Sequence, residues 1–293
     1  MSEGDRPPLV YLNTPNNPTG VVYSDDELRA LAAVLRRYNA LVLSDEIYGA
    51  FHHTNQHRSI ATHYPEGTIV SDGISKWCGA GGWRLGTFSL PSGFEWLRDG
   101  MLRVASETYS SASTPIQYAA VEAYGGGLAM KRYLERTRTI LGALLGRLWV
   151  EFEGVDAHLV KPEGGYYFYP DLEPMRQKLA ARGIETGPQL AEKIHNELGI
   201  AVLPGADYGQ EASALTFRVA YVNFDGAQML RELEERPSTR LDRRFIEKYC
   251  AKVIEATQKL SGWLGSTFAL FCLQSSSGSQ CVAEELSQSN REF

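Results

Sequence analysis

Apolar residues near the start of the chain form three short runs, and each run predicts a strand. The runs are Pro8 to Leu12, Ala40 to Ser44 and Thr68 to Ser71. A continuous apolar run is typical of a strand that is covered on both faces of a parallel sheet, and we expect this for Ala40 to Ser44.

A helix is predicted between the first two strands. Ser24 and Glu27 have the spacing of a capping box, in which the two side chains satisfy backbone N–H groups at a helix start. We expect the helix to end near Tyr38 and Asn39. Its apolar residues recur at helical spacing: Leu28, Leu31, Val34 and Leu35.

The remainder of the chain divides at glycine and proline positions. The break Gly125-Gly126-Gly127 precedes a long amphipathic helix predicted at Met130 to Glu151, and strand and helix patterns alternate from Val155 to about Glu235. One more amphipathic helix is expected after Pro237, before a Ser-rich tail whose last residues should be disordered. The predicted units are 1–127, 128–235 and 236–293.

Composition and charge exclude several classes of protein. A chain of 293 residues with 43% hydrophobic content can bury a sizeable core, and its net charge of -6 argues against nucleic-acid binding. The polar start Met1 to Asp5 is unlike a signal peptide, and the apolar stretch Trp263 to Leu273 is too short to span a membrane. We expect a cytoplasmic protein, because no C-x-x-C pair occurs among the cysteines Cys78, Cys250, Cys272 and Cys281.

Residues with distinctive chemistry follow each predicted strand. The turn-rich loop Asn13 to Gly20 follows the first, Asp45 ends the second, and Lys76 follows the third, with Arg84 beyond it in a Lys-x₇-Arg spacing. Ligands of open α/β sheets bind at the carboxyl edges of the strands, so we expect one site here. A lysine amine reacts with carbonyl groups, and a guanidinium binds phosphate through paired hydrogen bonds.

The order of five residues resembles that of the class I/II aminotransferases, which have fold type I and use pyridoxal 5'-phosphate. The motifs that carry the resemblance are Asn16-Asn17-Pro18-Thr19-Gly20, Ser44-Asp45-Glu46-Ile47-Tyr48 and Lys76 with Arg84. The resemblance covers roughly residues 8 to 235. The five residues are Asn17, Asp45, Tyr48, Lys76 and Arg84.

The resemblance implies a role for each of the five. Lys76 would hold the cofactor aldehyde as a Schiff base and then carry the substrate's α-proton as general base and acid. Asp45 would keep the ring nitrogen protonated, while Asn17 and Tyr48 would donate hydrogen bonds to the ring's phenolic oxygen. Arg84 would bind the phosphate.

Three further residues match family positions. Arg218, in a strand predicted over Ala214 to Val222, is similar to the family arginine that binds the substrate's α-carboxylate; an exposed strand arginine is the alternative. Tyr167, in a glycine-aromatic segment, matches the border of the substrate pocket, although core packing is favoured for it. Ile47 matches the residue packed on the ring face, and simple core packing is equally compatible.

Taken singly, each of these residues also has an ordinary interpretation. An aspartate after a strand often caps a helix, and a lysine is usually a solvated charge. The joint order favours the cofactor site. We predict no metal, because a histidine-rich segment lacks a completing cysteine or carboxylate and is expected to be a solvated loop. Its histidines are His52, His53, His57 and His63.

The resemblance implies a three-layer α/β/α PLP-transferase large domain followed by a smaller α+β domain. Only 16 residues precede Asn17, whereas family members have a long segment there that cradles the phosphate, so the large domain is expected to be incomplete at its N-terminus. Gly73 stands where many relatives have a serine that touches the phosphate. Both departures weaken the expected phosphate binding.

The implied function is transfer of an amino group between an α-amino acid and a 2-oxo acid by a cytoplasmic homodimer. Two alternatives stay open. One is a non-catalytic or impaired member of the fold that serves in assembly or regulation. The other is a PLP-dependent lyase or synthase, because this fold supports several reactions.

Overall fold

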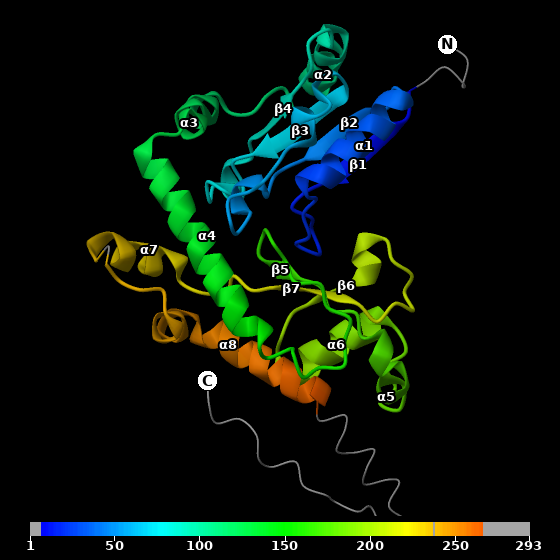
Figure 1. Cartoon of the computed structure of the whole chain (residues 1–293), viewed down its shortest axis with the longest axis vertical. Coiled ribbons are helices and arrows are strands. Elements are labelled where there is room, and N and C mark those ends of the chain that lie inside the picture. Colours follow the sequence, from blue (N-terminus) through cyan, green and yellow to red (C-terminus); the bar gives the residue numbers. More distant parts are fainter. Residues whose placement is uncertain (1–6, 237, 266–293) are drawn as a thin grey trace, which may run out of the picture.

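Two β-sheets, each with its own set of helices, make up the described part of the chain. The structure is a computed structural model that describes residues 7–236 and 238–265. The larger sheet has the strand order β1-β2-β3-β4, and the smaller has the order β5-β7-β6 (Figure 1). The strands of the larger sheet are β1 Leu9–Asn13, β2 Leu41–Asp45, β3 Thr68–Gly73 and β4 Gly86–Ser89. Those of the smaller sheet are β5 Tyr167–Phe168, β6 Leu203–Pro204 and β7 Phe217–Ala220.

The parallel part of the larger sheet brings the predicted strand ends to one edge. β1, β2 and β3 pair in parallel, with Asn13 opposite Asp45 and Asp45 opposite Ser71. The three strands predicted from apolar runs are therefore confirmed. β4, which the sequence did not reveal, pairs antiparallel with β3 and returns the chain from the Lys76 loop.

Helix α1, Asp25–Arg37, covers one face of this sheet. Its capping box is formed as predicted, since the Ser24 hydroxyl accepts from the backbone N–H of Glu27 and the Glu27 side chain accepts from the backbone N–H of Ser24. Leu28 and Leu35 of α1 belong to one apolar cluster with Leu12 and Val42 of the sheet.

The expectation that β2 is buried on both faces is wrong. Val42, which packs with α1, and Ser44 are buried, whereas Leu41, Leu43 and Asp45 are only half-buried. Apolar character at every position of a strand fits a covered sheet, but the sequence of the strand does not determine what covers it.

Helices α2 and α3 contribute little to the core of the described chain. α2, Glu95–Thr108, contains no buried residue, and α3, Thr114–Gly125, buries only Ala120. Gly126 and Gly127 both have positive φ, so they end α3 and let the chain turn into α4, Leu128–Trp149. This long helix confirms the one predicted at Met130 to Glu151, and it runs from the upper part of the molecule to the lower (Figure 1).

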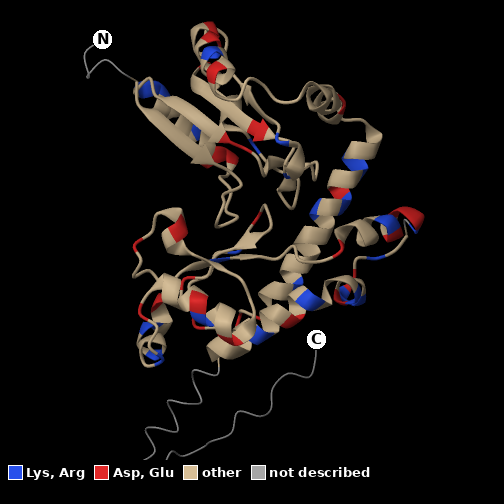
Figure 2. Ribbon diagram, turned by 180° about the vertical axis from the view of Figure 1, so that it is seen from behind, with Lys and Arg blue, Asp and Glu red and all other residues tan. Residues whose placement is uncertain are grey.

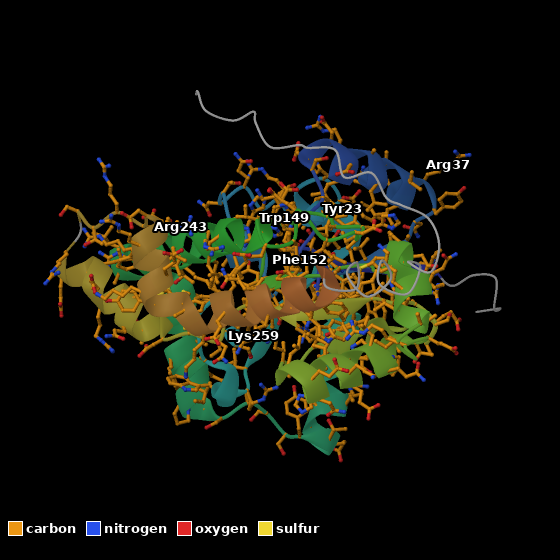
Figure 3. All side chains as sticks on the ribbon, turned by 90° about the horizontal axis from the view of Figure 1, so that it is seen from below. Tyr23, Arg37, Trp149, Phe152, Arg243 and Lys259 are labelled. Atoms are coloured by element: carbon orange, nitrogen blue, oxygen red, sulfur yellow. The ribbon has the colours of Figure 1, made fainter. Side chains whose placement is uncertain are left out.

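The smaller sheet is enclosed by α4 and the later helices. α8 is the helix predicted after Pro237, and it lies against α4 with a kink at Cys250. In Figure 3, seen from below, α8 crosses the base of the molecule. Phe152 packs edge-on against Phe168 of β5, with 5.0 Å between the ring centroids. The remaining helices are α5 Arg176–Ala180, α6 Gly187–Leu198, α7 Gly226–Glu235 and α8 Arg243–Gly265.

Further expectations concern membranes, charge and the end of the chain. The described residues contain no helix with both the length and the apolar character needed to cross a bilayer. In Figure 2 the ribbon of α4 carries both basic and acidic positions, with the basic ones in the majority. The expected disordered tail lies outside the described residues, and the three unit boundaries stay a prediction.

Candidate active site

The asparagine loop after β1 is folded on itself and fixed to the smaller sheet. The Asn13 side chain accepts from the backbone N–H of Asn17 at 2.7 Å. At Gly20, φ is +72° and an added Cβ would lie 2.6 Å from Pro162, so only glycine fits without displacing its neighbours. The Gly20 carbonyl also accepts from the backbone N–H groups of Glu163 and Gly164. The loop that holds Asn17 is thereby joined to the glycine-aromatic segment.

Asp45 lies at the carboxyl end of β2, and both oxygens of its carboxylate accept hydrogen bonds. The Tyr11 hydroxyl donates to Oδ2 at 2.7 Å, and the backbone N–H of Ile47 donates to Oδ1 at 3.2 Å. The amide of Asn13 donates to the Asp45 backbone carbonyl at 3.1 Å. The carboxylate is therefore held between β1 and the turn that leads to Tyr48.

Tyr48 is buried beneath this turn. Its hydroxyl lies 2.7 Å from the hydroxyl of Tyr167, and burial together with this hydrogen bond raises the pKa of the Tyr48 phenol. The Nζ atom of Lys76 lies 5.7 Å from the centroid of the Tyr48 ring. Tyr48 thus links Lys76 to the glycine-aromatic segment as a neutral phenol.

Four of the five predicted cofactor residues line one cavity. The volume of this cavity is about 410 Å³. Asn17, Asp45, Tyr48 and Lys76 come from three different strand-end segments, and the fold brings them together as the sequence predicted. The full lining is Tyr11, Leu12, Asn13, Asn16, Asn17, Tyr23, Asp45, Ile47, Tyr48 and Lys76.

The structure does not bring Arg84 to this cavity. Arg84 is exposed at the end of a short 3₁₀ turn, Gly81–Trp83, with φ at +55°. Its Nη1 donates to the carbonyl of Gly81 at 2.7 Å. The guanidinium is thus bonded to its own loop, and its predicted phosphate contact remains a proposal.

Arg218 reaches the asparagine loop from β7. Its Nη1 donates to the side-chain oxygen of Asn17 at 2.8 Å, and its Nε is buried without a hydrogen-bond partner among the described residues. The guanidinium carbon lies 4.3 Å from the ring centroid of Tyr167 and 5.3 Å from that of Tyr208. A partly buried cation with an unused donor is suited to an anionic group such as a carboxylate.

Tyr167 is packed in the core and also contacts two of the candidate site residues. Its side chain is buried in the main apolar cluster, so core packing is confirmed. It also bonds Tyr48 and lies under Arg218. Ile47 lines the cavity and is partly buried against the same cluster.

Sequence reasoning missed Tyr11 and Tyr208. Tyr11 is two positions before Asn13 on β1, so both side chains lie on one face of the strand. The pairing of Asn13 with Asp45 places that face beside the Asp45 carboxylate. Strand periodicity combined with the parallel register could have identified Tyr11. Tyr208 ends the short 3₁₀ turn Gly205–Tyr208 and gave no local signal.

The histidine-rich segment is not a solvated loop. His52 is buried, and the Nε2 atoms of His57 and His63 lie 2.8 Å from carboxylate oxygens of Glu46 and Asp25. Burial, with further repulsion from neighbouring histidines, lowers the pKa of His52 to about 4. The sequence gave no sign of these partners because the carboxylates lie 11 and 38 positions away. The described residues contain no group of three or more metal-binding side chains.

Glu46 joins the Asp45 turn to this histidine segment. Ser44 and Ser59 donate to its Oε1 at 2.9 and 2.5 Å, and His57 faces its Oε2. Burial alone would raise the pKa of Glu46, but the hydrogen bonds from His57 and Ser59 outweigh burial and lower it. Glu46 is therefore an ionised carboxylate that holds the turn after Asp45 against the histidine-rich segment.

Comparison with known proteins shows the family and agrees with the fold. The family model "Aminotransferase class I and II" matches residues 2–234. The aspartate aminotransferase of Bacillus sp. (strain YM-2) is 31% identical over 237 residues, which are 79% of this chain and 57% of that protein. The asparagine–oxo-acid transaminase of Streptococcus mutans is 30% identical and is matched over 50% of its length. The chain thus spans little more than half the length of these relatives.

Solved structures show the same fold. The aromatic aminotransferase from Pyrococcus horikoshii OT3 superimposes with a TM-score of 0.68 at 25% identity, over 87% of this chain and 60% of that one. The aspartate aminotransferase of Thermus thermophilus gives a TM-score of 0.67 at 24% identity. The fold is that of the α/β PLP-transferases, as expected. The chain belongs to the class I and II aminotransferase family.

Proposed function

We propose that this chain binds pyridoxal 5'-phosphate and takes part in transamination between an α-amino acid and a 2-oxo acid. The observation that supports this most directly is the single cavity lined by Asn17, Asp45, Tyr48 and Lys76, with Arg218 bonded to Asn17 at its border. The amine of Lys76 can bind an aldehyde, and the carboxylate of Asp45 can accept from a protonated pyridine nitrogen. Asn17 and Tyr48 can donate to a phenolic oxygen, and the guanidinium of Arg218 can bind a substrate carboxylate. The residues present therefore fit the cofactor.

When bound, the cofactor supplies an electron-withdrawing ring that acidifies the α-carbon of an attached amino acid. Asp45, whose carboxylate is fixed by two donors, would hold the cofactor's ring nitrogen protonated. Tyr48 and Asn17 would donate hydrogen bonds to the phenolic oxygen of the cofactor. Lys76 Nζ takes the α-proton of the substrate and returns it as general acid.

Arg218 orients the substrate. Its guanidinium is held by Asn17 and by the rings of Tyr167 and Tyr208, and its unused Nε can donate to a carboxylate. A carboxylate bound there leaves the amino group free to lie toward the cavity that Lys76 lines. The pairing of a planar cation with a planar anion favours α-amino acids over simple amines.

Reduction with borohydride tests the proposal. Purified chain is mixed with pyridoxal 5'-phosphate, reduced, digested and mapped by mass spectrometry. The cofactor mass should be found on the peptide that contains Lys76 and should be absent from Lys76→Ala, while Lys131→Ala, at an exposed position on α4, serves as the matched control. Label confined to other lysines would disprove the role of Lys76.

A second candidate function is that of a family member that binds the cofactor but turns over little. One observation favours it, namely that Arg84 is exposed and bonded to the Gly81 carbonyl rather than lining the cavity. Spectroscopic titration with pyridoxal and with pyridoxal 5'-phosphate separates the two candidates. Tighter binding of the phosphorylated form, lost in Arg84→Ala, supports a working phosphate site, and equal affinity for both forms supports the second candidate.

We also propose a homodimer in the cytoplasm. Large apolar side chains are exposed on α2 and α3, among them Trp96, Leu102 and Tyr118, and an apolar surface of this kind favours association. Cys78 and Cys250 are free thiols, which fits a reducing compartment. Light scattering at several concentrations tests the dimer.

A further inference from the structure

Tyr11 makes a contact that none of the roles above requires. It lies on β1, where it is opposite Leu43 of β2, and its hydroxyl crosses to the end of β2 and donates to Asp45 Oδ2 at 2.7 Å. This is the length of a strong hydrogen bond to a charged acceptor. A phenol on one strand is thus bonded to the carboxylate at the end of the next strand.

The bond leaves the carboxylate with capacity to accept. An ionised carboxylate has about four lone-pair positions, and Asp45 uses one on Oδ2 for Tyr11 and one on Oδ1 for the Ile47 N–H. Asp45 also lines the cavity with Lys76. The two bonds fix the plane of the carboxylate, and the remaining positions can accept from a donor inside the cavity.

The Tyr11 phenol stays protonated and can donate throughout the physiological range. Partial burial and the hydrogen bond to Asp45 raise its pKa to about 12. The other titratable groups that line the cavity are Tyr23, Tyr48 and Lys76. The side chain of Tyr11 is otherwise 62% exposed, so the small buried area of the ring gives it little part in the core.

We propose that Tyr11 is a positioning residue that holds the Asp45 carboxylate in the orientation needed to bind a protonated ring nitrogen. The identity of that nitrogen rests on the proposed function. The hydrogen bond between Tyr11 and Asp45 does not depend on it. Tyr11 acts only through Asp45. Removal of its hydroxyl frees the carboxylate to rotate about its Cβ–Cγ bond and weakens the effect of Asp45 on proton transfer.

The first test uses the chain without cofactor. Tyrosines are replaced by 3-fluorotyrosine, and the ¹⁹F signal that is lost in Tyr11→Phe is assigned to Tyr11 and followed with pH in the wild type and in Asp45→Ala. The fluorinated phenol ionises at lower pH than tyrosine, which moves its titration toward neutral pH. We expect Tyr11 to ionise at clearly lower pH in Asp45→Ala. The same titration curve in both proteins would overturn the proposal.

The second test is a double-mutant cycle on the single-turnover reaction with an amino acid, in the presence of pyridoxal 5'-phosphate. Tyr11→Phe should slow the rate by roughly 10-fold and leave the apparent amino-acid affinity unchanged, because one hydrogen bond to a charged group is lost. In the Asp45→Ala background the same substitution should have no effect. An equal effect in both backgrounds would show that Tyr11 does not act through Asp45 and would overturn the proposal.

The matched control is Tyr38→Phe, because Tyr38 has the same 62% exposure as Tyr11 and lies at the end of α1. It should change neither readout. If the wild type binds no pyridoxal 5'-phosphate, the proposed function fails, and the ligand-free titration alone then decides whether Tyr11 holds Asp45.

Discussion

Arg218 and Asn17 are bonded directly, with 2.8 Å between Nη1 and Oδ1, although 201 positions separate them in the sequence. The bond joins β7 of the smaller sheet to the loop after β1 of the larger one (Figure 1). It brings the proposed carboxylate-binding cation to the border of the cavity that Lys76 lines. The site is therefore built across the two sheets.

Replacement of Arg218 should impair the binding of amino acids selectively. In Arg218→Ala the apparent amino-acid affinity should fall by roughly 10- to 100-fold, because a charge-assisted pair is lost, while the matching amine without a carboxylate should be unaffected. Arg218→Lys should recover only part of the loss, since an ammonium lacks the planar pair of donors. Single-turnover kinetics measure both substrates.

The control for Arg218 is Arg98→Ala, an exposed arginine on α2 that pairs with Asp99. It should leave both affinities unchanged. Equal losses for the amino acid and the amine in Arg218→Ala would assign Arg218 another role.

Asp72 should destabilise the folded chain at neutral pH. Burial raises its pKa, one carboxylate oxygen is buried without a partner among the described residues, and the other accepts from Tyr124 at 3.2 Å. The unfolded chain loses the proton near pH 3.8 and the folded chain loses it at higher pH, so stability falls as pH rises through this interval. Asp72→Asn should therefore raise the thermal unfolding midpoint at pH 7, and the gain should shrink as pH approaches 3.8. The exposed Asp99→Asn is the control, and a lower midpoint for Asp72→Asn at pH 7 would contradict this prediction.

His52 should make the chain sensitive to mild acid. Its pKa is about 4 in the folded chain against 6.5 for an unperturbed histidine, because burial disfavours the charged ring. Between these values only the unfolded chain binds the proton, so stability is lost as pH falls from 6.5 to 4. His52→Gln should reduce this acid-induced loss in the free energy of unfolding by on the order of 3 kcal/mol, since one pKa unit corresponds to about 1.4 kcal/mol. Urea unfolding at several pH values measures it.

The exposed His158→Gln serves as the control for His52, since 72% of its side chain is accessible. It should follow the wild-type dependence on pH. An unchanged dependence in His52→Gln would show that another group causes the acid sensitivity.

Two leucines should differ sharply in their importance for stability. Leu148 of α4 is 1% exposed in the main cluster, whereas Leu102 of α2 is 61% exposed. Leu148→Ala should lower the free energy of unfolding by about 2–5 kcal/mol, because it leaves a cavity. Leu102→Ala should change it by about 0.5 kcal/mol or less. Urea unfolding measures both, and a large loss at Leu102 would show that α2 packs against something in solution.

Local patterns in the sequence were sufficient for much of the fold and the site. The Ser24–Glu27 capping box, the three parallel strands and the long helix before Trp149 were all predicted, because each depends on residues close together in the chain. Lys76 and Asp45 were found for the same reason, since each follows a recognisable strand. Arg218 stands in a predicted strand, and the family resemblance added its role.

Only the tertiary structure decided which distant groups meet. His57 is bonded to Glu46 and Arg218 to Asn17, and no local pattern indicates these partners. The sequence also did not reveal that one face of β2 is only partly covered. An apolar run indicates that a strand can be buried, but it does not indicate which element covers it. Hydrogen bonds and burial between distant segments depend on sheet register and helix placement, and these are set by packing over the whole chain.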